Sequence, residues 1–229
     1  MNGSGTAVLW SALGSSFVLV ALAGCIAIPI GVGAAIYLEE YGFRGRLARI
    51  VDVNVASLAG VPSVIYGLLG LALFVRVLEF GRGFLAGAAT LALLMLPQVI
   101  LAARDALRAV PPALREGSYA LGATRWQTVR HQVLPAALPE ILSGLVRSVT
   151  RALGEATPLI VLGALVALPA ETGTAGGPLA ALPPRIFEWM SQPAASVPRH
   201  AAAGMIALLS LLVAMTAVAA WIRGRRRVV

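Results

Sequence analysis

Five long apolar segments constrain this chain more than any other feature of its sequence. About 20 helical residues are enough to cross the roughly 30 Å hydrocarbon core of a bilayer. Of all residues, 59% are hydrophobic and 12% are charged, whereas soluble domains average about 25% charged residues. The sequence therefore predicts an all-α, polytopic membrane protein with five spanning helices. The predicted spans are residues 14–38, 55–75, 84–103, 141–168 and 201–222.

The distribution of arginine predicts which connections face the cytoplasm. All 18 basic residues are arginine, and the net charge is +8. Twelve of them fall in residues 39–54, in residues 104–140 and in the C-terminal tail, and four fall in the other connections. Because positively charged loops stay inside, we expect these two connections and the C-terminus to be cytoplasmic. Five crossings then place the N-terminus outside. Because membrane topology accounts for the surplus of arginine, we expect no nucleic-acid partner.

Several classes of protein are excluded by the cysteine and histidine content. Cys25 is the only cysteine, so the chain is not a disulfide-stapled secreted domain. His131 and His200 lie far apart and share no metal-ligand spacing with Cys25, so we expect no metal, no cofactor and no catalytic centre. Residues 1–13 lack the basic residues that begin a signal peptide, so the first apolar segment is expected to be a mature span.

Two of the connections are long enough to have structure of their own. Residues 104–140 are polar, arginine-rich and broken by prolines, which predicts two short cytoplasmic helices. Residues 169–200 are rich in Gly, Pro, Thr and Ala and predict an external loop, with a short helix at the membrane interface around residues 186–190. No soluble domain is visible, so residues 1–229 are expected to form a single membrane domain.

Only the fourth apolar segment carries charged residues in its interior. Arg147, Arg151 and Glu155 follow one another at intervals of four, which puts them on one stripe of a helix. A charge near the bilayer centre costs about 2.5–3.5 kcal/mol, so it needs a partner or a cavity. Either Arg151 and Glu155 neutralise one another, or the stripe faces a pathway for an anion, which the planar arginine fork binds well. Pro158 predicts a kink beside Glu155.

Small and polar residues at the start of the second segment are further candidates for such a pathway. Ser63 and Tyr66, with Gly60, Pro62 and Gly67, can line it, while Pro62 and the glycines can equally well serve close helix packing. At the end of the first segment, Glu39 and Glu40 are expected to be a solvated helix end.

Residues 116–135 contain a spaced motif inside the predicted cytoplasmic connection. Glu116 is followed by Gly122 and then by Leu134 and Pro135. The spacing resembles the loop signature of bacterial ABC importer permeases, in which a short coupling helix docks onto an ATP-binding subunit. An acidic residue suits a helix start, glycine permits a tight turn, and Leu-Pro is expected to begin the next helix. The alternative is a basic amphipathic helix lying on anionic lipid.

Three further stretches narrow the resemblance to one class of permease. Residues 29–42, 59–68 and 151–159 are similar to the membrane subunits of the high-affinity phosphate ABC importer. Residues 181–190, with the arginine-rich end, are similar to the A-type of its two permeases. The resemblance covers about residues 10–227.

This resemblance implies a type I ABC importer permease fold in a bacterial inner membrane. It also implies a second phosphate permease subunit, two ATP-binding subunits and an external phosphate-binding protein as partners, within the lipid bilayer. The pathway residues would be Arg151, Glu155 and Arg147, with Ser63 and Tyr66 beside them. Members of the family usually have six spanning helices, one of them before residue 14, whereas five are predicted here.

Other functions remain open from the sequence. A charged stripe also suits a permease for molybdate, sulfate or phosphonate. Secondary transporters usually show inverted repeats with broken helices, which are not visible here. A membrane enzyme would need catalytic groups within a span, and both histidines lie outside the predicted spans. The chain has no lysine and no P-loop, so ATP hydrolysis is expected in a separate subunit.

Overall fold

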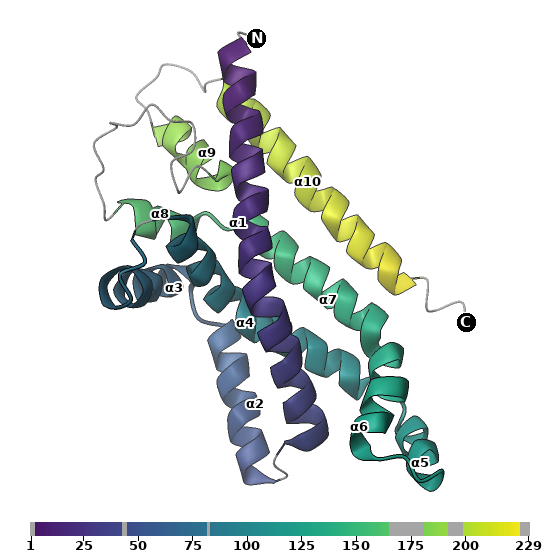
Figure 1. Cartoon of the computed structure of the whole chain (residues 1–229). Helices are drawn as coiled ribbons and strands as arrows, with labels where there is room; N and C mark the ends of the chain where they lie inside the picture. Colours follow the sequence, from purple (N-terminus) through teal and green to yellow (C-terminus); the bar gives the residue numbers. More distant parts are fainter. Residues whose placement is uncertain (1–2, 43–44, 82, 165–180, 192–198, 225–229) are drawn as a thin grey trace. The chain divides into compact units, whose positions relative to one another are not determined.

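The computed structural model describes residues 3–42, 45–81, 83–164, 181–191 and 199–224. Every regular element in these ranges is a helix, as Figure 1 shows. The elements are α1 (Gly3–Ile36), η1 (Tyr37–Tyr41), α2 (Arg46–Ala59), α3 (Ser63–Gly70), η2 (Leu71–Val77), α4 (Phe84–Arg108), α5 (Pro112–Ala120), α6 (Arg125–Thr128), η3 (Val129–Val133), α7 (Leu134–Gly154), α8 (Thr157–Ala164), α9 (Leu182–Ser191) and α10 (Arg199–Gly224), where η denotes a π-helix.

The described residues contain four helices that are long and apolar enough to cross a membrane. They are Leu9–Tyr41, Phe84–Arg108, Arg125–Gly154 and Ala201–Gly224, and a fifth span results if the broken pair α2 and α3–η2 is counted as one. The prediction of an all-α membrane protein is therefore confirmed.

The second predicted span, residues 55–75, is not one continuous helix. α2 ends at Ala59, and Pro62 has an extended backbone, with φ −56° and ψ 137°, directly before α3. Proline lacks an N–H and disfavours a helical conformation in the residue before it, so the helix stops here.

The fourth predicted span, residues 141–168, is also wrong as a single helix. α7 ends at Gly154, Glu155 and Ala156 are not helical, and α8 begins at Thr157. Pro158 is the second residue of α8, where its missing N–H leaves no hydrogen bond unmade. The expected kink is thus a complete break, and the last four residues of the predicted span lie outside the described residues.

The two compact units of the chain each combine distant segments. The first unit comprises Met1–Ile26, Val61–Met95 and Val149–Ala214, and the second comprises Ala27–Gly60, Leu96–Ser148 and Met215–Val229. The long helices α1, α4, α7 and α10 contribute to both.

In the first unit, α3 packs closely on α8. A Cβ added to Gly67 would lie 2.9 Å from the Cα of Pro158, closer than real Cβ atoms come to backbone. Gly67 therefore serves close packing. It lets the start of α3, which follows the break at Pro62, approach the start of α8, which follows the break at Glu155.

The short helix expected in the external loop is α9, which is anchored on the first unit. Leu182 and Trp189 of α9 are buried with Leu9 and Ala12 of α1 and Ala201 of α10. The backbone N–H of Leu182 donates to the hydroxyl of Ser16 at 2.7 Å. The rest of the predicted loop, residues 169–180 and 192–198, lies outside the described residues.

Candidate functional site

The predicted coupling loop, residues 104–140, contains two short helices, as expected. Pro111 precedes α5 with extended backbone, and Pro112 occupies its first position. Proline is favoured there because its φ suits a helix and its N–H would have no partner. Glu116 is the fifth residue of α5 and not its start, so the expected interaction with the helix dipole is wrong; its side chain is exposed.

The chain reverses between α5 and α6 at Gly122. This residue has φ +81°, a left-handed conformation that costs other residues steric strain. Thr124 then caps α6: its hydroxyl accepts from the backbone N–H of Gln127, and the Gln127 side chain accepts from the N–H of Thr124. We call residues 112–128 the α5–α6 hairpin, and the expected turn at Gly122 is confirmed.

Leu134 and Pro135 do not begin a separate helix, which corrects the prediction. The helical stretch runs without a break from Arg125 to Gly154 through η3. The N–H of Leu134 donates to the carbonyl of Val129, five residues earlier, so the turn before Pro135 is wider than an α-turn. This widening relieves the clash that a proline ring otherwise makes four residues back. The hairpin is thereby continuous with a spanning helix.

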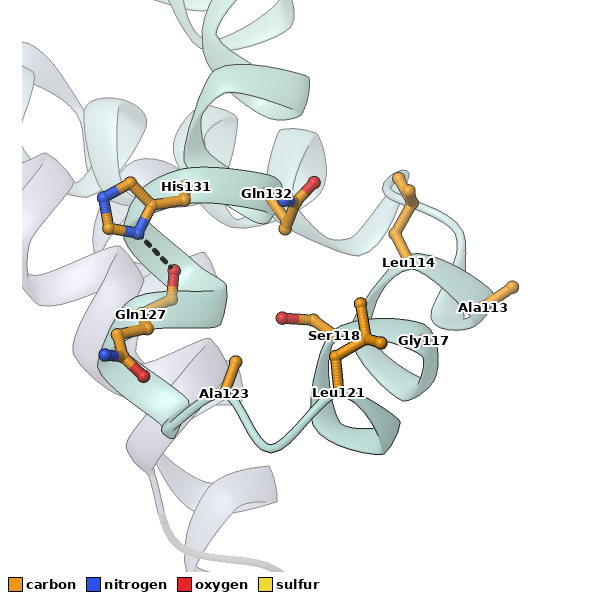
Figure 2. A pocket seen from close by; sticks show the side chains of 9 residues that line it. All are labelled: Ala113, Leu114, Gly117, Ser118, Leu121, Ala123, Gln127, His131 and Gln132. Atoms are coloured by element: carbon orange, nitrogen blue, oxygen red, sulfur yellow. Dashed lines mark hydrogen bonds between the residues drawn. The ribbon is translucent and has the colours of Figure 1, made fainter.

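A groove lies between α5 and the stretch formed by α6 and η3. It has a volume of about 490 Å³, and Figure 2 shows α5 side chains facing those of α6 and η3 across it. Leu121 is 90% exposed at the turn, so an apolar side chain stands free beside the groove. The lining residues are Ala113, Leu114, Gly117, Ser118, Leu121, Ala123, Gln127, His131 and Gln132. Small residues and an exposed leucine suit contact with another protein surface.

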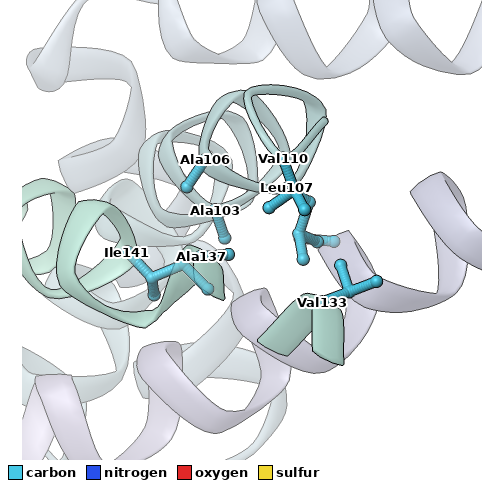
Figure 3. Packing of buried hydrophobic residues seen from close by; sticks show 8 residues of the cluster. Ala103, Ala106, Leu107, Val110, Val133, Ala137 and Ile141 are labelled. Atoms are coloured by element: carbon cyan, nitrogen blue, oxygen red, sulfur yellow. The ribbon is translucent and has the colours of Figure 1, made fainter. Parts of the chain in front are cut away.

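A buried apolar cluster in the second unit includes Val110 and Val133, which flank the hairpin in the sequence. It joins Ala35 of α1 to the end of α4 and to the η3–α7 stretch, and Figure 3 shows most of its members. The members are Ala35, Ala103, Ala106, Leu107, Val110, Val133, Ala137 and Ile141. Displacement of α7 at this point would therefore disturb α1 and α4 as well.

Four charged residues form an ion-pair network next to this cluster. Arg104, only 4% exposed, pairs with Glu39 at 3.4 Å and also with Asp52. Arg108 pairs with the same two carboxylates, at 2.9 Å and 3.2 Å. The two positive and two negative charges offset one another, so the buried Arg104 has the carboxylate partners that a buried charge requires.

The end of the first spanning helix also contacts both helices of the hairpin. Arg115 of α5 pairs with Glu40 of η1 at 2.9 Å, and Glu40 is 6% exposed. The guanidinium of Arg125 lies 5.4 Å from the ring centre of Tyr41. The expectation that Glu39 and Glu40 form a solvated helix end is wrong. Two features of the sequence are compatible with these contacts: the adjacent glutamates at the end of the first span, and Arg104 and Arg108, which lie one helical turn apart.

The predicted pathway residues are distributed over both units. Arg147 lies in the second unit, while Arg151 and Glu155 lie in the first. Both arginines are exposed, and no ion pair joins Arg151 to Glu155 within the described part of the chain. Ser63 is half-buried at the start of α3, and Tyr66 is buried one turn later. In these ranges no three His, Cys, Asp or Glu residues are placed to hold a metal ion.

Comparison with known proteins places the chain in a family. Residues 27–228 match the family described as binding-protein-dependent transport system inner membrane component. The phosphate transport system permease protein PstA 1 of Mycobacterium tuberculosis is 42% identical over 154 residues, 67% of this chain and 50% of that protein. PstA of Yersinia pestis is 34% identical over 205 residues, 90% of this chain and 68% of that protein. The chain thus spans half the length of its mycobacterial relative.

Solved structures agree on the fold. The crystal structure of an amino acid ABC transporter with histidines has a TM-score of 0.69, covering 96% of this chain and 94% of that one at 20% identity. The fold is therefore that of a type I ABC importer permease, and the resemblance found in the sequence is confirmed. The chain belongs to the binding-protein-dependent transport system inner membrane components, a family of multi-pass membrane proteins.

Proposed function

We propose that the chain is the permease subunit of an ATP-driven importer of inorganic phosphate. The observation that carries this proposal is its identity to phosphate permeases from distant bacteria, 42% and 34%. The exposed side chains of Arg147 and Arg151 fit this role because a guanidinium fork pairs well with phosphate oxygens.

The importer would contain several further subunits. We expect a second permease, two ATP-binding subunits and an external phosphate-binding protein. The α5–α6 hairpin would be the part that contacts an ATP-binding subunit, since its groove and its exposed Leu121 present apolar surface. ATP hydrolysis would occur in that partner, since this sequence contains no P-loop.

ATP-driven movement of the hairpin would reach the membrane through α7. Because the helix is unbroken from Arg125 to Gly154, a shift of α6 displaces the helix that carries Arg147 and Arg151. The break at Glu155 gives α7 and α8 freedom to change their relative direction. Arg151, Glu155 and Arg147, with Ser63 and Tyr66, are the residues that we propose for the substrate pathway.

The orientation in the membrane follows from the arginine distribution. We propose that residues 104–140 and the C-terminus are cytoplasmic and that residues 169–200, which include α9, are external. The hairpin then faces the compartment that contains ATP, and α9 faces the external binding protein.

Uptake of radiolabelled phosphate tests the proposal directly. The complete importer is expressed in a strain that lacks other phosphate importers, and arsenate, sulfate, molybdate and phosphonate are added as competitors. We expect saturable, ATP-dependent uptake that arsenate inhibits and the other anions do not. Stronger competition by molybdate, sulfate or phosphonate would assign the permease to another oxyanion. Uptake that depends on an ion gradient and does not require ATP would indicate a secondary transporter.

A further inference from the structure

We propose that Arg115 is a positioning residue that links the α5–α6 hairpin to the first spanning helix. The role rests on the proposed function, because it concerns how ATP-driven movement reaches the membrane. Nη2 of Arg115 donates to Oε1 of Glu40 at 2.9 Å, and Nε donates to the same oxygen at 3.3 Å. Glu40 belongs to η1, which continues α1. One end of this ion pair moves with the hairpin and the other with the span.

The same guanidinium also binds the last turn of α4 and the segment that follows it. Nη2 donates to the carbonyl of Leu107 at 2.9 Å, and Nη1 donates to the carbonyl of Val110 at 2.8 Å. The last carbonyl groups of a helix have no partner within it, and a cation is favoured beside them. Arg115 thus joins α5 to α1 and α4, which the apolar cluster also brings together.

A second arginine attaches the other helix of the hairpin to the same segment. Arg125, the first residue of α6, lies over Tyr41, and the Tyr41 ring stacks on Tyr37 with the ring centres 6.5 Å apart. Both helices of the hairpin therefore contact η1. Since Arg115 contacts the buried Glu40 and Tyr41 is exposed, Arg115 is the stronger of the two connections.

The geometry explains why the residue is arginine. One carboxylate and two carbonyl groups lie in different directions around it, and the planar fork reaches all three. A lysine ammonium is a single point of charge and would retain only part of this set. Arg115→Lys should therefore keep the loop in place and weaken the transmission of movement.

The test uses the complete importer, reconstituted in proteoliposomes. The variants are Arg115→Met, Arg115→Lys and Glu40→Gln, with Arg49→Met as the control because it removes one positive charge from an exposed site. Three quantities are measured for each: the ATPase subunit that co-purifies, ATP hydrolysis, and phosphate uptake per ATP. We expect Arg115→Met to retain the ATPase subunit and hydrolysis while uptake per ATP falls roughly tenfold, within the usual range of coupling between sites. Arg115→Lys and Glu40→Gln should lie between Arg115→Met and the control.

A second measurement does not depend on the substrate. Tyr37 of η1 is 56% exposed, so a Tyr37→Cys substitution in a Cys25→Ala background supplies a label site there. Its rate of maleimide labelling should change when ATP binds, and Arg115→Met should abolish that change.

The outcomes separate the two proposals. If the wild-type complex hydrolyses ATP without phosphate uptake, the phosphate assignment fails, and the labelling response alone decides the role of Arg115. Wild-type uptake per ATP and a normal labelling response in the Arg115 variants would overturn the inference. Loss of the ATPase subunit from every variant would also overturn it, since Arg115 would then only hold the loop together.

Discussion

The hydroxyl groups of Ser118 and Thr128 lie 2.8 Å apart and join α5 to α6 across the hairpin. Thr128 is completely buried, and Ser118 lines the groove. α5 and α6 are short and are joined by a four-residue turn, so this hydrogen bond contributes to their spacing. The groove that we assign to the ATP-binding partner depends on that spacing.

Thr128→Val removes the hydroxyl group but nearly preserves the volume of the side chain, so it should loosen the hairpin. We expect a loss of about 1 kcal/mol, typical of one hydrogen bond, and a matching decrease in affinity for the ATP-binding subunit. Ser118→Ala and the double variant complete a mutant cycle, which isolates the contribution of the pair. Local unfolding is followed by hydrogen exchange of the backbone amides of α5 and α6. Additive effects of the two substitutions would contradict the role given to this bond.

Gly122→Ala should strain the hairpin turn. Space is available for the added Cβ, but the φ of +81° is costly for alanine, by about 1–2 kcal/mol. Gly122→Trp should release the ATP-binding subunit, and Gly122→Asn should be tolerated better. Gly14→Ala is the control, because Gly14 is helical, does not line the groove and also has space for a Cβ. Equal co-purification of the ATPase subunit with Gly122→Trp and wild type would count against docking at this turn.

Cysteine labelling on whole cells tests the orientation. Phe187 of α9 and Leu121 of the hairpin are exposed, so each is replaced singly by cysteine in a Cys25→Ala background. An impermeant maleimide should label the Phe187 site on intact cells and the Leu121 site only after permeabilisation. The opposite pattern would invert the proposed topology.

The charged residues of the fourth predicted span are tested by removing both charges. Arg151→Met with Glu155→Leu should reach the membrane at normal levels, because no ion pair joins the two side chains in the described part of the chain. Phosphate uptake should fall about tenfold or more, since a hydrogen bond to a charged group contributes about 1.5–3 kcal/mol. Arg151→Lys should retain partial uptake, and Arg147→Gln should have a milder effect. Normal uptake by the double variant would exclude these residues from the pathway.

Arg104 should be among the most important residues for stability. Arg104→Met leaves Glu39 and Asp52 beside each other with only Arg108 to balance them. The two carboxylates left behind are 20% and 37% exposed, so the loss should be smaller than the roughly 3–5 kcal/mol of a fully buried pair. Thermal unfolding of the purified protein in detergent measures the loss, and the exposed Arg49→Met is the control. A melting temperature equal to that of the control would show that Arg108 alone neutralises both carboxylates.

Much of the architecture could be predicted from the sequence because it depends on local properties. The apolar segments at residues 14–38, 84–103 and 201–222 lie within helices long enough to span, since a bilayer selects for length and apolarity alone. The turn at Gly122 follows from glycine at a position with positive φ. The helix start at Pro112 follows from the fixed φ of proline.

Local sequence properties do not determine where a spanning helix breaks. Pro62 and Pro158 are visible in the sequence, but a proline can kink a helix, break it or be accommodated, as Pro135 is. Which of these occurs depends on the neighbouring packing and on whether a π-turn precedes the proline. The sequence pattern alone therefore predicted two continuous spans where the structure has breaks.

The contacts that organise the hairpin were decided by the tertiary structure. Arg115 and Glu40 are 75 residues apart, and Arg104 and Asp52 are 52 apart, so no local pattern specifies either pairing. Taken by itself, each of these charged side chains is typical of a helix end that is exposed to solvent. The packing of α1, α4 and η3–α7 around one apolar cluster brings the end of the first span to the arginines, and α2 supplies Asp52 from outside that cluster. Because Arg104 and Glu40 are buried, each needs an ion-pair partner, since an unpaired charge is costly in a low-dielectric interior.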